Sequence, residues 1–273
     1  MTGKAGTQAA VPATAVAGTT PVEPIFSYRG FNIPERLVRL TGGGPETWDP
    51  ISRMHMDEYA RYCPIDPRAN VVEIGCGVGR DAIQLTSLLT PEGQYTGVDV
   101  IEPSIRWCSE NITPRFPNFK FVHVDVQSDI HNPGGKMRVS EVMLPAEDCT
   151  VDRIILQSVF THMFREQIIP YLREFRRMLK PDGLVFASLF LLDDESRRLS
   201  RLGDNPLRFE HPYGEGCFIN DVRYPEGAVA FSAKAMQEML AASRMKLAQP
   251  IYLGAWCGRP ANDGQDVAIL ARG

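Results

Sequence analysis

The stretch that decides the fold is residues 71–80, VVEIGCGVGR. A β-branched, apolar run that carries one acid, Glu73, ends abruptly at three glycines on alternate positions, Gly75, Gly77 and Gly79. β-Branched residues favour a stiff strand, whereas glycine lets the backbone adopt conformations that other residues avoid. A strand that stops at such a turn allows a ligand to approach the backbone closely, so the identity of that ligand becomes the central question.

Strand-like and helix-like segments alternate from this stretch onward. Strands are expected at 71–74, 94–100, 120–124, 151–156, 183–192, 245–253 and 266–271, and helices at 80–89, 103–112, 163–180 and 233–242. The Pro181-Asp-Gly183 stretch is expected to stop the third of these helices. Alternation of this kind predicts an α/β fold with a doubly wound, mostly parallel seven-stranded sheet and helices on both faces.

Two regions interrupt the alternation and define the predicted domain plan. Residues 25–68 precede the first of these strands and are expected to form an N-terminal helical cap segment, most clearly at 51–62. Residues 193–232 follow the fifth strand and are too long for a plain connection, which predicts a lid insertion over a substrate. Residues 1–24 are rich in Ala, Thr, Gly and Pro and are expected to be a disordered tail, so that 25–273 form a single domain.

Composition argues against several classes of partner. The formal net charge is −4, which does not favour nucleic acid. The longest apolar run, residues 184–192, is too short to span a membrane. The six cysteines include no C-x-x-C pair, and no secretion signal is recognisable, so we expect free thiols in a cytoplasmic protein.

The spacing of the glycines excludes two familiar nucleotide motifs. A dinucleotide fingerprint, G-x-G-x-x-G, would need a glycine where Arg80 stands. A phosphate loop would need a lysine after the last glycine, and none follows. What remains is the pattern acid-x-Gly-x-Gly-x-Gly at the end of a first strand.

This pattern resembles that of the class I S-adenosylmethionine-dependent methyltransferases. Further stretches resemble the family in the same order: YTGVD, which ends at Asp99, FVHVDVQ around Asp125, DRIILQSVFTHMF, and RRMLKPDGLVFAS. The resemblance covers roughly residues 65–192 by motif and residues 233–273 by element order only. It implies a Rossmann-like methyltransferase fold, S-adenosylmethionine as the methyl donor and S-adenosylhomocysteine as the product.

The resemblance also implies roles for individual residues. The glycine turn would cradle the amino-acid part of the cofactor, and Glu73 would receive its ammonium group. Asp99 would accept both ribose hydroxyls, and Asp125 would meet the adenine amino group with the Val126 backbone beside it. The complete set of expected cofactor residues is Glu73, Gly75, Cys76, Gly77, Gly79, Arg80, Asp99, Val100, Asp125, Val126 and Gln157.

The segment after the fourth strand bears on the methyl acceptor. Enzymes that methylate nucleobase amines carry an Asp/Asn-Pro-Pro-aromatic stretch there, whereas this chain has Gln157-Ser-Val-Phe160. The SVFTHM form resembles that of enzymes acting on small molecules, so we expect O-methylation of a sugar or secondary metabolite. The alternatives are N-methylation of a small-molecule amine and a non-catalytic protein that binds the cofactor. A homodimer is compatible with the sequence.

Two histidines are candidates for a catalytic base. His162 follows the fourth strand, where an imidazole could remove a proton from a hydroxyl acceptor. The alternative for His162 is a role in capping or packing the next helix. His211, in the RFEHPYGEG stretch of the expected lid, is the second candidate.

The paired acids Asp193 and Asp194 follow the fifth strand, where some O-methyltransferases hold magnesium. Those enzymes also use an aspartate near the end of the fourth strand, where this chain has Gln157. The two acids also suit the start of a helix at 194–202. We therefore favour the helix cap over a magnesium site and assign no metal ligand.

Overall fold

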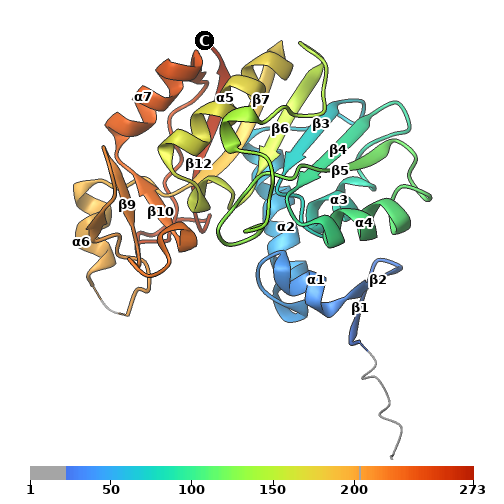
Figure 1. Ribbon diagram of the computed structural model, residues 1–273, viewed down its shortest axis with the longest axis horizontal. Helices are drawn as coiled ribbons and strands as arrows, with labels where there is room; N and C mark the ends of the chain where they lie inside the picture. The colour runs from blue at the N-terminus through green and yellow to red at the C-terminus, as the bar shows by residue number, and fades with distance from the viewer. Residues whose placement is uncertain (1–22, 203) are drawn as a thin grey trace, which may run out of the picture.

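The computed structural model describes residues 23–202 and 204–273 (Figure 1). The predicted disordered tail lies outside the described residues, apart from its last two positions, Glu23 and Pro24. Within the described part of the chain, no helix is both long enough and apolar enough to cross a membrane.

Seven strands form the central sheet in the order β11-β12-β7-β6-β3-β4-β5. The parallel strands are β3 (Asn70–Ile74), β4 (Gln94–Asp99), β5 (Phe119–His123), β6 (Val151–Leu156) and β7 (Leu179–Leu189), and the antiparallel ones are β11 (Met245–Leu247) and β12 (Asp266–Arg272). This order confirms the predicted sheet. The chain leaves β3 toward β4 and β5 and later returns to β6 on the other side of β3. Ligands bind at the carboxyl ends of the strands beside such a reversal.

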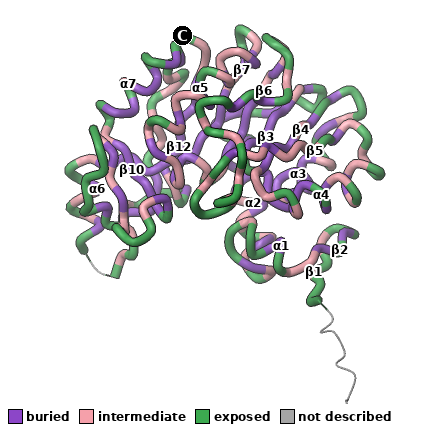
Figure 2. Tube along the Cα trace, in the orientation of Figure 1, coloured by how far each residue is buried: buried purple, intermediate pink, exposed green. Residues whose placement is uncertain are grey.

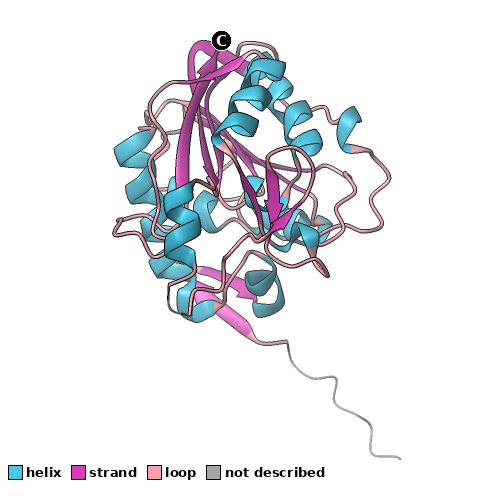
Figure 3. Cartoon of the chain, turned by 90° about the vertical axis from the view of Figure 1, so that its left-hand side faces the viewer, coloured by secondary structure: helices cyan, strands magenta, loops and turns pink. Residues whose placement is uncertain are grey.

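Helices cover both faces of the sheet (Figures 1 and 3). The helices are α2 (Pro45–Tyr62), α3 (Arg80–Leu85) and α4 (Glu102–Asn111), followed by α5 (Arg165–Met178) and α7 (Ala233–Ser243). Val71 belongs to the buried cluster that contains Ile83, whereas Val72 belongs to the cluster that contains Phe175. Successive strand residues point to opposite faces, so β3 is buried on both. Figure 2 shows the trace of β3 coloured mostly as buried.

The N-terminal cap segment contains a hairpin that the sequence pattern did not predict. β1 (Ile25–Tyr28) pairs with β2 (Phe31–Pro34), and α1 (Glu35–Leu40) and α2 follow. Arg29 and Gly30 form the turn with φ of 46° and 77°. Positive φ at both central residues is the two-residue hairpin geometry that matches the twist of the strands.

The insertion after the fifth strand of the predicted series, β7, is folded. It contains α6 (Asp194–Ser200), β8 (His211–Pro212), β9 (Cys217–Ile219), the short helix η3 (Pro225–Gly227) and β10 (Val229–Phe231). β8, β9 and β10 form an antiparallel sheet, with Phe190, Phe209 and Trp256 packed in a small cluster of their own. The Asp193 carboxylate accepts a hydrogen bond from the Ser196 amide at 2.6 Å, which confirms the helix-cap interpretation.

Several predicted boundaries were wrong. α5 ends at Met178 rather than at 180, and two short helices, η1 (Val139–Glu141) and η2 (Phe160–His162), precede it. Pro181-Asp-Gly183 does not stop a helix but lies inside β7, where the pairing with β6 shifts register between Val151 and Arg153. A local bulge accommodates the extra residues. The strand expected at 245–253 is shorter, because β11 ends at Leu247.

Candidate active site

A cavity of about 460 Å³ lies at the carboxyl ends of β3, β4 and β6, beside the reversal of strand order. Its walls come from the glycine turn, from residues 40–58 of the cap segment and from the segment after β6. Small-molecule sites typically have volumes of roughly 300–1,000 Å³. The cavity is therefore large enough for a nucleoside-sized ligand and part of a second molecule.

The glycine turn has no room for a side chain at Gly75 or Gly77, the two glycines that line the cavity. Gly75 and Gly77 have φ of 75° and 52°, which other residues rarely adopt. A Cβ atom on Gly75 would lie 2.6 Å from Val159, and one on Gly77 would lie 2.5 Å from Thr41. The turn is thus a backbone cradle, and the cap segment packs against it. The Thr41 hydroxyl of that segment accepts a hydrogen bond from the Val78 amide at 3.0 Å.

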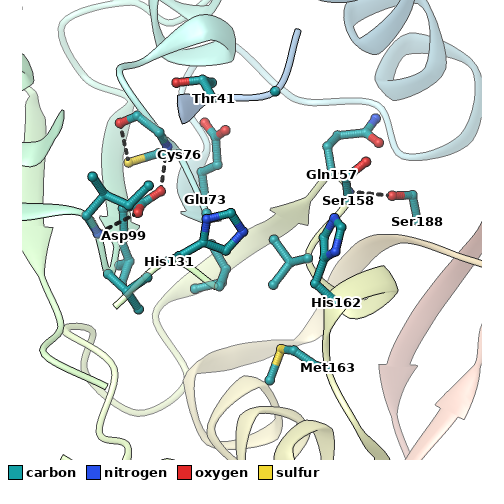
Figure 4. Close-up of a pocket in the computed structure, with 18 of the residues that line it drawn as sticks. Thr41, Glu73, Cys76, Asp99, His131, Gln157, Ser158, His162, Met163 and Ser188 are labelled. Atoms are coloured by element: carbon teal, nitrogen blue, oxygen red, sulfur yellow. Dashed lines mark hydrogen bonds between the residues drawn. The ribbon is translucent and has the colours of Figure 1, made fainter. Parts of the chain in front are cut away.

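Asp99 fixes the cradle from the end of β4. Its carboxylate accepts from the Gly77 amide at 2.6 Å and from the Ile101 amide at 2.8 Å (Figure 4). Burial raises the pKa of Asp99, and the two amides act in the opposite direction. Each carboxylate oxygen retains a further lone pair that can accept from a ligand hydroxyl.

Glu73 lies at the base of the cavity and already has a partner. Its carboxyl accepts from the Tyr95 hydroxyl, and its side chain is 5% exposed. Burial, together with the charge of Asp81, raises its pKa well above the ordinary range. This environment favours the neutral acid.

Two imidazoles lie beside one another across the cavity from the glycine turn. The rings of His131 and His162 are 6.0 Å apart, between Asp99 on one side and Gln157 on the other (Figure 4). His162 Nδ1 lies 2.9 Å from the Glu226 carbonyl oxygen. A carbonyl can only accept, so Nδ1 carries the hydrogen and the lone pair of neutral His162 is on Nε2. Burial and the neighbouring His162 lower the pKa of His131.

The cap segment adds polar groups that sequence reasoning missed. His55 Nδ1 lies 2.9 Å from both carboxylate oxygens of Asp81, which also accepts from the Tyr59 hydroxyl at 2.7 Å. Glu58, one turn further along α2, accepts from the Gln157 side chain at 2.6 Å. Both cap residues line the cavity and are buried. Glu226, His131 and residues 264–265 were also missed as cavity residues.

Most of the predicted site residues come together in this cavity. Those that line it are Glu73, Gly75, Cys76, Gly77, Arg80, Asp99, Val100, Val126, Gln157 and His162. Gly79, Asp125 and His211 do not line it. Gly79 instead begins α3 with φ of 81°, where an added Cβ would meet Ile112 at 2.8 Å.

The other two departures are corrections to the predicted site. Val124 and Val126 line the cavity, whereas Asp125 does not, and its carboxylate accepts from the Asn132 side chain at 3.0 Å. His211 is exposed in β8, at the edge of the small antiparallel sheet, and is not placed to act as a base in this cavity.

Comparisons with known proteins agree with this architecture. The family model described as "Methyltransferase domain" matches residues 71–183, from β3 into β7. Three similar solved structures are the PH0226 protein from Pyrococcus horikoshii OT3 (15% identity, 85% of this chain, 93% of that chain, TM-score 0.54), the pyocyanin biosynthetic protein PhzM (13%, 81%, 55%, 0.54) and the glycopeptide N-methyltransferase MtfA (13%, 81%, 90%, 0.52). This chain spans only 55–60% of the length of three of the matched structures.

The strand order of the sheet and the matched segment together define a class I methyltransferase fold. Residues 71–183 match a methyltransferase domain, and the strand order of the sheet is that of the Rossmann-like methyltransferase fold. The cavity suits S-adenosylmethionine, because the cradle admits no side chain at Gly75 or Gly77, and the buried Gln265 Oε1 and Arg80 Nε atoms have no hydrogen-bond partner. An amide oxygen and a guanidinium N–H are groups that a zwitterionic amino acid can satisfy.

Asp99→Ala is expected to weaken cofactor binding about tenfold or more, since a charge-assisted hydrogen bond contributes roughly 1.5–3 kcal/mol. Titration calorimetry with S-adenosylhomocysteine measures the effect. Asp125→Ala is the matched control, because it removes a carboxylate from the end of the next strand that does not line the cavity. Equal affinities of wild type and the Asp99 variant would contradict the role of Asp99.

Proposed function

We propose that the protein transfers a methyl group from S-adenosylmethionine to a hydroxyl of a small molecule, with His162 as the general base. The observation that carries the proposal is the hydrogen bond from His162 Nδ1 to the Glu226 carbonyl. It orients the ring and leaves the Nε2 lone pair available to the cavity. When bound, the cofactor supplies an electrophilic methyl group on sulfur.

The chain itself positions the acceptor and removes its proton. Glu226 is 6% exposed, and its carboxylate accepts from the Gln167 side chain at 2.9 Å and from the Asp129 amide at 3.2 Å. The backbone that holds His162 is therefore fixed from two sides. An imidazole in a fixed orientation can take a hydroxyl proton without reorganising, which is the condition for efficient general-base catalysis.

The character of the cavity supports a small acceptor. Apolar side chains line it alongside the polar groups: Ile51 and Met54 from α2, Val139 from η1 and Met163 from the segment after β6. A few placed polar groups on an apolar lining are typical of sites for compact metabolites. A sugar or natural-product hydroxyl fits this description. A small-molecule amine is the second candidate, and its test is part of the pH experiment with His162 below.

The segment 193–232 is proposed to act as a lid on the acceptor side, because Glu226, its residue at the cavity, holds His162. We expect this segment to exchange its amide hydrogens more slowly when cofactor product and acceptor are both bound than with the product alone. Hydrogen exchange measured by mass spectrometry tests this, with residues 80–85 of α3 as an internal reference. Equal protection of 193–232 in the two states would argue against a lid.

A further inference from the structure

Among the residues that the structure describes, five carboxyl groups line the cavity, and each has at least one hydrogen-bond partner. Asp99 accepts from the Gly77 amide of the glycine turn and from the Ile101 amide that follows β4. Glu226 is held by Gln167 and Asp129 on the side of His162. Asp81 pairs with His55 and Tyr59. Glu73 accepts from Tyr95 at the base of the cavity.

Glu58, like Glu73, has a single neutral hydrogen-bond donor, but it comes from the cap helix α2 and lies beside Gln157 rather than at the base of the cavity. Its side chain lies on α2, is 4% exposed, and accepts from the Gln157 amide at 2.6 Å. A buried carboxylate with one neutral donor is under-satisfied, because its two oxygens can accept about four hydrogen bonds. Burial raises the pKa of Glu58, the Gln157 hydrogen bond opposes that rise, and a bound cation would oppose it further.

The register of the sheet places Glu58 over the first glycine of the turn. Glu73 pairs with Ile155 in the parallel ladder between β3 and β6, so two residues later Gly75 comes beside Gln157. Glu58 accepts a hydrogen bond from the Gln157 side chain and therefore lies at the β6 side of the glycine turn. Asp99 lies on the opposite, β4, side.

A second acceptor without a partner lies next to this corner. The Gln265 side chain donates to the Ser158 hydroxyl at 2.7 Å, and its Oε1 atom is buried with no hydrogen-bond partner. Ser158 directly follows Gln157 in the chain. The corner thus combines an under-satisfied carboxyl with an unpartnered amide oxygen, and both accept hydrogen bonds. The ligand group that suits two such acceptors is a cation with several N–H donors.

We propose that Glu58, rather than Glu73, binds the α-ammonium group of the cofactor's amino-acid part, with Gln265 Oε1 as a further acceptor. If Asp99 takes the ribose, the amino-acid part extends along the glycine turn toward β6, where this corner lies. The cap helix α2 thereby becomes part of the cofactor site. The inference concerns cofactor binding only and holds whichever atom receives the methyl group.

The test compares S-adenosylhomocysteine with its deaminated analogue, which keeps the carboxylate, by titration calorimetry. The wild type is expected to bind the parent compound about 10- to 100-fold more tightly, as for loss of a charge-assisted hydrogen bond. Glu58→Gln should reduce this preference to about threefold or less, because a neutral amide gains little from a charged partner. The matched variant Glu73→Gln should keep the full preference.

Two results would overturn the proposal: Glu58→Gln keeps the wild-type preference, or Glu73→Gln loses it. If either variant fails to fold, hydrogen exchange of the wild type decides. Residues 50–62 of α2 should become more protected with S-adenosylhomocysteine than with the deaminated analogue at equal saturation. Equal protection would likewise overturn the assignment. No methyl acceptor enters either measurement, so the outcome is independent of the proposed O-methylation.

Discussion

His162→Gln is expected to lower turnover on a hydroxyl acceptor by roughly 10²–10⁴-fold, the usual scale for loss of a general base. The physical reason is the fixed tautomer: Nδ1 donates to the Glu226 carbonyl, so Nε2 of the neutral ring accepts the proton. Cofactor affinity should change little, because Glu226 and Gln167, the groups around His162, lie on the acceptor side. Steady-state kinetics and calorimetry on the same preparations measure both quantities.

The pH dependence separates the hydroxyl and amine mechanisms. A protonated imidazole cannot accept a proton, so the wild-type rate should fall at low pH, and this limb should disappear in the His162 variant. With an amine acceptor, the limb follows the amine and persists in both proteins. A fully active His162→Gln enzyme would show that the base is wrongly assigned. So would a rate abolished by a chelator or by Asp193→Ala but not by His162→Gln.

His131→Gln is the matched control for the neighbouring ring. His131 lies 6.0 Å from His162, toward Asp99 and hence toward the cofactor side. We expect His131→Gln to affect turnover less than His162→Gln does. A larger loss of turnover in the His131 variant would show that His131, rather than His162, is the base.

The sequence predicted those features that single strands and their turns encode. The run 71–74 and its three glycines specify a buried strand that ends in a backbone cradle, and the alternation that follows specifies the parallel sheet. The carboxyl ends of parallel strands meet at one edge, so Asp99 and His162 could be placed near the cradle before any coordinates were known. Both line the cavity.

What the sequence did not predict depends on contacts between distant segments. His55 and Glu58 look like ordinary polar residues of an amphipathic helix, and they are buried only because α2 packs over the glycine turn. Glu226 contacts His162 from the insertion 193–232, and the sequence of that segment has no periodic pattern from which its path could be predicted. Asp125 does not line the cavity for a different reason: the sequence does not specify the exact residue at which β5 ends, and Val124 and Val126 line the cavity instead.

Asp266→Ala is expected to destabilise the fold by roughly 3–5 kcal/mol, because it leaves several buried donors without an acceptor at about 1–3 kcal/mol each. Asp266 is fully buried at the start of β12. Its carboxylate accepts from the Leu191 amide at 2.6 Å, the Gly254 amide at 2.7 Å and the Trp256 indole at 2.8 Å. It thus joins the start of β12 to the segment just before the insertion and to the loop that leads to Gln265.

Urea unfolding monitored by circular dichroism measures this loss, and the melting temperature should fall by roughly 10 °C or more. Asp266→Asn keeps one carbonyl oxygen as an acceptor and should retain part of the stability. Asp182→Ala removes an exposed carboxylate from β7 and should stay within about 0.5 kcal/mol of wild type. If Asp266→Ala were as stable as Asp182→Ala, the three donors would have to find other acceptors, and the insertion would not depend on this carboxylate for its attachment to the sheet.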